Sequence, residues 1–243
     1  MCGRYAITLP PEAVRAWFRY PEQPNFPPRY NIAPTQPIPI VCRDDRQIGD
    51  PARHFRLVRW GLVPSFVKDW NAFPLLINAR AEEIAAKPSF RAAMIRRRCL
   101  VIADAYYEWQ RIQPRVTGTP FLCRRADGRP MAFAGLHERW MGADGSEMET
   151  ACIVTTHANG AMSAIHSRMP VILEEQDYET WLDVDRVDVA RATALLRPAG
   201  DDVLDMFPVA PRVNKVANDD ASVQEPVGAA PPRAPIRQTS FDF

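Results

Sequence analysis

The feature that most restricts the fold of this chain is a succession of short β-strand candidates without a repeating alternation of strand and helix. Runs rich in β-branched and aromatic residues and bounded by turn-forming residues are typical of strands. They occur at residues 2–8, 38–42, 56–62, 99–103, 106–110, 120–123, 131–136, 150–156 and 169–173. Since a parallel sheet would need a regular βαβ rhythm, the sequence predicts an α+β fold with a largely antiparallel, barrel-like sheet.

Short helices are expected between these strands, at residues 10–18, 81–86, 90–96, 158–165, 177–182 and 187–196. The first has proline in its first turn and an apolar face at Val14, Trp17 and Phe18. Residues 21–39 are rich in proline, so we expect a long surface loop that is excluded from the centre of a sheet. Residues 1–227 are expected to form one domain, and residues 228–243 a disordered tail rich in Ala, Pro and Arg.

Composition excludes several classes of protein. The chain has 243 residues, 47% of them hydrophobic, and no apolar run approaches the ~20 residues of a membrane span. Without a signal peptide the protein is expected to be cytoplasmic. Its 30 basic and 29 acidic residues give no overall basic character, so an anionic partner must be met locally. Five cysteines without a CxxC pair predict neither a zinc site nor a disulfide framework, and no metal or cofactor is expected. The internal four are expected to be buried thiols: Cys42, Cys99, Cys123 and Cys152.

Cys2 is the first candidate for chemistry. Removal of Met1 would leave Cys2 with a free α-amine, which titrates near ~7.7–8.0, and a thiol, which titrates near ~8.5. Such a 1,2-aminothiol condenses with an aldehyde to an imine, and the sulfur then closes a thiazolidine ring. The alternative is an ordinary, disordered terminal residue. The alternation of Tyr5 and Ile7 with smaller or polar residues favours a strand that holds the terminus in a sheet.

Two further clusters precede the middle of the chain. In the segment 59–64, Gly61 would permit close approach of a ligand and Trp60 offers a stacking face, or Trp60 is a core residue at a strand end. Asn78 and Arg80 place an amide and a guanidinium two residues apart, before an expected helix. Asn78 could equally be an N-cap and Arg80 a surface ion-pair partner.

Two titratable candidates follow. Glu108 lies between aromatic residues, whose desolvation would raise its pKa and make it a usable proton carrier, although it could instead face water. His166 lies in a turn that leads to an apolar strand, and histidine there is a natural acid or base, although a lone histidine is usually structural. The other three are expected to be structural: His54, His137 and His157. The candidates for meeting an anion are Arg4, Arg59, Arg80, Arg168 and the run 96–98, of which the run is most often a solvated face.

Seven ordered motifs resemble the SRAP family of abasic-site processing proteins, first named SOS response-associated peptidases. They are Cys-Gly-Arg-Tyr at 2–5, Tyr-Asn-Ile-Ala-Pro at 30–34, Arg-Trp-Gly-Leu-Val-Pro at 59–64, Asn-Ala-Arg-Ala-Glu at 78–82, Tyr-Glu-Trp at 107–109, Ala-Gly-Leu at 134–136 and His-Ser-Arg-Met-Pro at 166–170. The resemblance extends to about residue 227 and implies the SRAP fold.

The resemblance also implies a function. The protein would sense abasic sites in single-stranded DNA and bond to their C1′ aldehyde through Cys2, as a reversible thiazolidine crosslink that shields the site from strand cleavage. Removal of Met1, autocatalytic or by an aminopeptidase, would expose Cys2. Glu108 would move protons around the amine and assist reversal, His166 would help to open the deoxyribose ring, and Asn78 would hold the adduct by a hydrogen bond.

For DNA binding, the resemblance implies that Arg4, Arg80 and Arg168 bind flanking phosphates. Trp60, beside Gly61, would stack on or wedge beside a base. We expect a monomer that is associated with the nucleoid when bound to DNA; the sequence names no replication-fork partner. Two alternatives stay open. One is an amidohydrolase with Cys2 as an N-terminal nucleophile, and the other is a non-covalent DNA-binding module.

Overall fold

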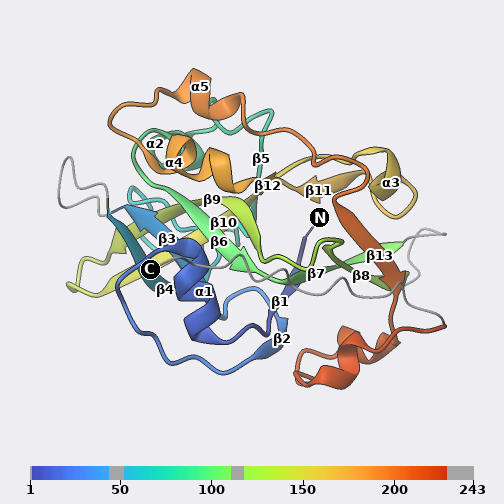
Figure 1. The fold of residues 1–243 in the computed structure, drawn as a ribbon. Coiled ribbons are helices and arrows are strands. Elements are labelled where there is room, and N and C mark those ends of the chain that lie inside the picture. The colour runs from blue at the N-terminus through green and yellow to red at the C-terminus, as the bar shows by residue number, and fades with distance from the viewer. Residues whose placement is uncertain (1, 44–51, 111–117, 229–243) are drawn as a thin grey trace.

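A closed β-barrel forms the centre of the molecule in the computed structural model, which describes residues 2–43, 52–110 and 118–228. Its strands follow the order β10-β4-β3-β6-β9, and pairing of β9 with β10 closes it (Figure 1). Only the β4–β10 contact within this ring is parallel. The prediction of an α+β fold with a largely antiparallel, barrel-like sheet is confirmed. The bounds are β3 Pro37–Arg43, β4 Arg53–Trp60, β6 Arg98–Ala103, β9 Met131–Met141 and β10 Glu147–His157.

A second, fully antiparallel sheet packs on the barrel, with the order β13-β8-β7-β1-β2. Aromatic rings join the two: Tyr5 of β1 meets Trp60 of β4 edge-on at 5.3 Å, and Tyr106 of β7 meets Phe133 of β9 at 5.9 Å. Each buried aromatic side chain removes a large apolar area from water, and edge-to-face pairs of this kind stabilise such a contact. The bounds are β1 Arg4–Ile7, β2 Arg29–Ile32, β7 Ala105–Gln110, β8 Thr119–Arg125 and β13 Leu204–Pro208.

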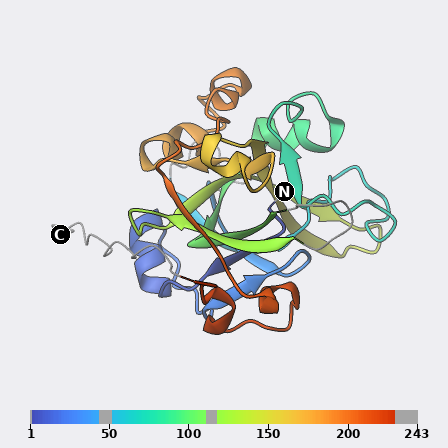
Figure 2. The same cartoon turned by 90° about the vertical axis from the view of Figure 1, so that its right-hand side faces the viewer.

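Short helices cover the barrel, with α2, α4 and α5 together on one side and α1 on another (Figures 1 and 2). Arg98 fixes α4: it is buried, and its guanidinium donates to the carbonyl oxygens of Trp181 at 2.6 Å and Asp183 at 2.7 Å. This residue of the run 96–98 is therefore structural and not a solvated face. The bounds are α1 Pro11–Phe18, α2 Pro88–Arg96, α3 Gly160–Ser163, α4 Tyr178–Leu182, α5 Val189–Thr193, η1 Glu175–Asp177, η2 Pro211–Asn214 and η3 Ala221–Gln224.

The structure corrects several expected elements. The helix expected at 81–86 is a series of turns. The preceding residues form β5, Asn78–Arg80, which pairs in parallel with β10, and the chain leaves this strand through turns and not through a helix. The proline-rich segment 21–39 is not all loop, since it contains β2, at the edge of its sheet, and the first three residues of β3. Its expected exclusion from the centre of a sheet is wrong for residues 37–39, because β3 lies between β4 and β6 and its first residues, Pro37 and Pro39 among them, pair with β4. β13 was not expected, and α3 and α5 are shorter than expected. The strand expected at 169–173 is divided into β11, Arg168–Pro170, and β12, Ile172–Leu173. Residues 229–243, most of the expected tail, lie outside the described residues.

Candidate active site and nucleic-acid interface

Cys2 lies two residues before the start of β1, and its side chain is fully buried. β1 is held between β2 and β7, with Tyr5 opposite Tyr106 and Arg4 opposite Tyr107, so the predicted anchoring of this end in a sheet is confirmed. Burial raises the pKa of the Cys2 thiol far above its usual range, and the negative charge of Glu108 raises it further. The thiol is therefore held protonated at neutral pH. The four internal cysteines are buried thiols, as expected.

Glu108 lies on β7 and is 3% exposed, which excludes the alternative that it faces water. Its Oε1 accepts a hydrogen bond from the backbone N–H of Trp109 at 3.2 Å. Two residues further along β7, Gln110 donates from Nε2 to the carbonyl oxygen of Ala164 at 2.9 Å. This bond ties the end of β7 to the segment that carries His166. The two expected proton carriers thus lie on segments joined by a direct contact.

His166 is half-buried between α3 and β11. Its Nδ1 accepts a hydrogen bond from the backbone N–H of Arg168 at 3.0 Å. The same Nδ1 lies 3.3 Å from the carbonyl oxygen of Arg168, so both backbone groups of Arg168 face this side of the ring. These two contacts fix the orientation of the imidazole between α3 and β11.

Asn78 contacts Cys2 directly. It begins β5, where pairing with Ile153 of β10 fixes its backbone, and its Nδ2 donates to the carbonyl oxygen of Cys2 at 3.0 Å. Its Oδ1 is buried and has no hydrogen-bond partner among the described residues. A buried amide oxygen without a donor is costly, so this atom is a free acceptor beside the Cys2 backbone. The N-cap alternative is wrong, since Asn78 lies within a strand.

The three predicted phosphate-binding arginines lie in different surroundings. Arg168 forms a two-pronged ion pair with Glu82, at 2.8 and 3.0 Å, and this pairing lowers the pKa of Glu82. Arg80 is 55% exposed, and its nearest carboxylate is that of Glu83 at 3.8 Å. Arg80 is therefore the one of the three most open to a phosphate.

Arg4 has a structural task. Its guanidinium donates to Asn31 Oδ1 at 2.9 Å and to the carbonyl oxygens of Val213 and Asn214 at 2.8 and 3.2 Å. These bonds join β1, β2 and η2. They occupy three of the five N–H groups of the guanidinium, so contact of Arg4 with DNA stays a prediction.

Trp60 does not offer a stacking face in this structure. Its side chain is fully buried, and its indole N–H donates to the carbonyl oxygen of Ile77 at 3.0 Å. The reason is that β4 is a barrel strand whose end is covered by Tyr5 of the second sheet. The alternative of a core tryptophan at a strand end is the one observed. Gly61 is also buried, with a φ of 132° that favours glycine.

Sequence reasoning missed Trp70 and Phe73. Together with Arg59 and Gly61 they line a cavity of about 200 Å³. The signal available was two aromatic residues within a segment without strand or helix periodicity, since binding residues are often carried by loops.

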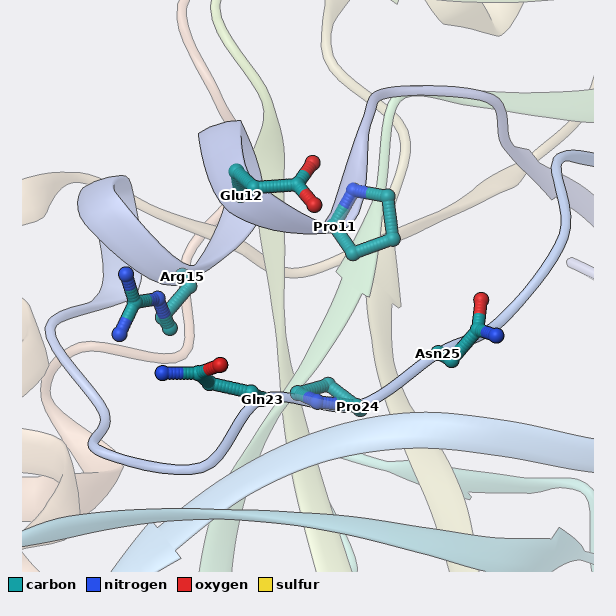
Figure 3. Close-up of a pocket in the computed structure, with 6 residues that line it drawn as sticks. All are labelled: Pro11, Glu12, Arg15, Gln23, Pro24 and Asn25. Atoms are coloured by element: carbon teal, nitrogen blue, oxygen red, sulfur yellow. The ribbon is translucent and has the colours of Figure 1, made fainter.

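Another hollow of about 200 Å³ lies between α1 and the following loop (Figure 3). Its lining side chains, which include Glu12 and Arg15, are exposed or half-buried, and none of them belongs to the candidate site. Within residues 2–43, 52–110 and 118–228, no group of three metal-ligating side chains could hold a metal ion, and no helix could span a membrane.

Comparison with known proteins agrees with this arrangement. The family model of SOS response associated peptidase (SRAP) matches residues 1–216. The chain is 35% identical over 228 residues to the abasic site processing protein YoqW of Bacillus subtilis, covering 93% of this chain and 99% of YoqW. It is 28% identical to the rat abasic site processing protein HMCES, covering 90% of this chain and 74% of HMCES. A crystal structure of a Bacteroides thetaiotaomicron protein superposes with a TM-score of 0.81 at 25% identity, covering 93% and 99% of the two chains. With a family model matched over most of its length, the chain belongs to the SRAP family.

Proposed function

We propose that this protein processes abasic sites in single-stranded DNA by bonding to them covalently and reversibly through Cys2. The observation that carries the proposal is the buried Cys2, whose carbonyl oxygen is held by Asn78 and whose thiol is coupled to Glu108. The names of the relatives YoqW and HMCES, both abasic site processing proteins, support the substrate. Met1 lies outside the described residues, and its removal, autocatalytic or by an aminopeptidase, is part of the proposal.

The chemistry proceeds in two bond-forming steps. The α-amine of Cys2 adds to the C1′ aldehyde of the opened deoxyribose, and loss of one water gives an imine. The thiol then adds across the carbon–nitrogen double bond: sulfur bonds to C1′, the thiol proton leaves, and the nitrogen gains a proton. The product is a five-membered thiazolidine. Because the imine is consumed, the β-elimination that would break the strand cannot proceed from it.

The surroundings of Cys2 favour this order of steps. A thiol whose pKa is raised by burial stays protonated, so the amine reacts with the aldehyde first. Glu108 is suited to receive the thiol proton, since the same buried carboxylate that disfavours a thiolate can take up the proton when sulfur attacks. The reverse transfer would reopen the ring and release the DNA.

Asn78 and His166 complete the proposed site. The Oδ1 of Asn78 can accept a hydrogen bond from the Cys2 amine while its Nδ2 holds the Cys2 carbonyl oxygen. His166, whose Nδ1 faces the backbone of Arg168, would act through its other ring nitrogen on the ring oxygen of the closed deoxyribose and so assist opening to the aldehyde. Arg80 would bind a flanking phosphate. We further propose that the protein acts as a monomer, in the cytoplasm and on the nucleoid.

The test is a crosslinking assay with mature protein and a single-stranded oligonucleotide that carries one abasic site. We expect a denaturation-resistant band whose intact mass equals protein without Met1 plus DNA minus one water, absent from Cys2→Ala. Cys123→Ala, which removes another buried thiol, is the matched control and should keep the band. Crosslinking by protein that retains Met1, or a bond mapped to another side chain, would overturn the proposal.

The same assay separates the two alternatives. An amidohydrolase should turn over glutamine or peptide amides and leave no adduct on the oligonucleotide. A non-covalent binding module should retain DNA equally well in wild-type protein and Cys2→Ala, with no band that resists denaturation. Either result would replace the crosslinking function.

A further inference from the structure

The cavity lined by Arg59, Gly61, Trp70 and Phe73 lies close to the proposed reaction centre. Leu75, one of its lining residues, precedes Asn78 by three residues, so their Cα atoms are at most about 11 Å apart. The segment between them is fixed: the N–H of Leu62 donates to the carbonyl oxygen of Leu76 at 2.9 Å, and the indole of Trp60 is bonded to Ile77. The cavity is therefore held near Cys2 by rigid backbone pairing.

A cation without a carboxylate partner forms one wall. The Arg59 guanidinium lies 5.3 Å from the centroid of the Trp70 ring, and its Nη1 donates to the carbonyl oxygen of Gly61 at 3.1 Å. No carboxylate in the described part of the chain pairs with it, in contrast to Arg168. Partial burial lowers the pKa of Arg59, which remains a cation at neutral pH. A half-buried arginine with unused donors is suited to the acceptor atoms of a nucleobase or to a phosphate.

The cavity is preformed. Trp70 and Phe73 pack against a small apolar cluster of Val63, Val67 and Trp140, and this cluster fixes the loop that carries them. A Cβ at Gly61 would collide with Leu75 and lie 2.9 Å from Arg59 Nη1, so glycine is what lets these two walls approach.

The backbone at the rim is strained. Thr35 has a φ of 75°, a conformation that a β-branched residue rarely adopts, and it is held there by donation of its N–H to the carbonyl oxygen of Trp60 at 2.8 Å. The turn of residues 33–36, closed by donation of the Gln36 N–H to the carbonyl oxygen of Ala33 at 3.2 Å, enforces this conformation and fixes Thr35 at the rim of the cavity.

We propose that this cavity, formed by Thr35, Arg59, Gly61, Trp70, Phe73 and Leu75, binds one nucleobase of the same DNA strand, at a fixed distance from the lesion. The inference rests on the proposed function, because the base is delivered by the strand whose abasic sugar reaches Cys2. Trp70 and Phe73 pack against the face of the base, and the Arg59 guanidinium donates hydrogen bonds to the acceptor atoms at its edge. A cavity of about 200 Å³ is smaller than the sites of drug-sized ligands, as a single base requires.

The first test changes the DNA and uses wild-type protein, so its result does not depend on whether a protein variant folds. A set of oligonucleotides, each with the abasic site and one additional nucleotide replaced by a stable tetrahydrofuran spacer, keeps every phosphate and lacks one base. At subsaturating DNA, we expect a single spacer position to slow wild-type crosslinking, by about fivefold to a hundredfold, as loss of one stacked base does. Equal rates at all positions would overturn the inference.

Protein variants then locate the effect. In Trp70→Ala and in Arg59→Gln, a spacer at the sensitive position should no longer slow crosslinking, because the cavity of these variants does not bind the base that the spacer removes. Ile95→Ala, which truncates an exposed apolar side chain on α2, is the control and should keep the wild-type pattern. Persistence of the position effect in both cavity variants would place the base elsewhere and refute the assignment. Saturating DNA should still give full crosslinking in both, whereas absence of any crosslink from wild-type protein would reject the proposed function itself.

Discussion

The Glu108→Gln substitution removes a buried charge from beside Cys2 while it keeps the shape of the side chain. Two opposite effects follow. The thiol becomes easier to ionise, because the negative charge that raises its pKa is gone. The site also loses the group proposed to take up the thiol proton during ring closure. The second effect is expected to dominate, since burial, which the substitution leaves unchanged, is the main cause of the raised thiol pKa.

The size of the effect follows from the role of the carboxylate. A positioned general base contributes roughly 10²- to 10⁴-fold to a rate. Removal of the Glu108 charge also lowers the pKa of the Cys2 thiol, and this offsets part of the lost rate. We therefore expect crosslinking to slow by about 100-fold at pH 7. The deficit should shrink as pH rises, because hydroxide then takes over removal of the proton.

The assay is the single-turnover rate of crosslink formation, read by denaturing gel between pH 6 and 9 with saturating abasic oligonucleotide. Glu149→Gln is the matched control: it removes a half-buried carboxylate of β10 that is paired with Arg56, away from Cys2, and should leave the rate unchanged. A Glu108→Gln variant that crosslinks as fast as wild type at pH 7 would refute the assigned role. A deficit that is equal at every pH would refute proton transfer as its cause.

Three other predictions concern positioning, stability and pH. Asn78→Ala removes the donor to the Cys2 carbonyl oxygen and should slow crosslinking by about tenfold, the effect of one hydrogen bond, with a loss of about 1 kcal/mol in the free energy of unfolding; an unaltered rate would contradict its role. Arg98→Met removes the guanidinium that donates to four buried carbonyl oxygens, of which that of Asp183 keeps the N–H of Val187, and should lower the free energy of unfolding by at least about 3 kcal/mol in a denaturant titration; a loss below about 1 kcal/mol would contradict this account. Burial raises the pKa of Cys152 to about 12, so above the unfolded pKa of ~8.5 the unfolded state loses a proton that the native state keeps, and stability falls as pH rises. In denaturant titrations from pH 8.5 to 10.5, the free energy of unfolding should fall with pH less steeply in Cys152→Ala than in wild type, by about 1 kcal/mol per pH unit. An identical slope in the two proteins would show that this thiol is not the cause.

Several features of the site could be predicted because they depend on neighbours in sequence. The alternation of Tyr5 and Ile7 predicted the strand that anchors Cys2 in a sheet, and the aromatic residues around Glu108 indicated a desolvated carboxyl. Both depend on local periodicity and on the size of adjacent side chains. The barrel-like sheet was predictable for the same reason, since strand candidates without a helical rhythm leave few other architectures.

Other features depend on residues far apart in the chain. The turns at 81–86 have an apolar and charged pattern compatible with a helix, but pairing of β5 with β10 directs the backbone elsewhere. Trp60 has the same local sequence whether it stacks on DNA or fills a core, and Tyr5, 55 positions earlier, covers it. The pairing of Arg168 with Glu82 likewise joins two motifs that the sequence treats separately.

By itself the sequence supplied the candidate groups for chemistry, namely an aminothiol that one cleavage would expose, an amide, a carboxyl and an imidazole, within motifs in the order typical of the SRAP family. Tertiary structure decided which of these groups meet. Asn78 reaches the Cys2 carbonyl oxygen from 76 residues away, and Arg4 holds Val213 across 209. The physical reason is that local propensity sets the shape of a segment, whereas strand pairing and burial across the whole chain set its neighbours, its access to water and the pKa of its side chains.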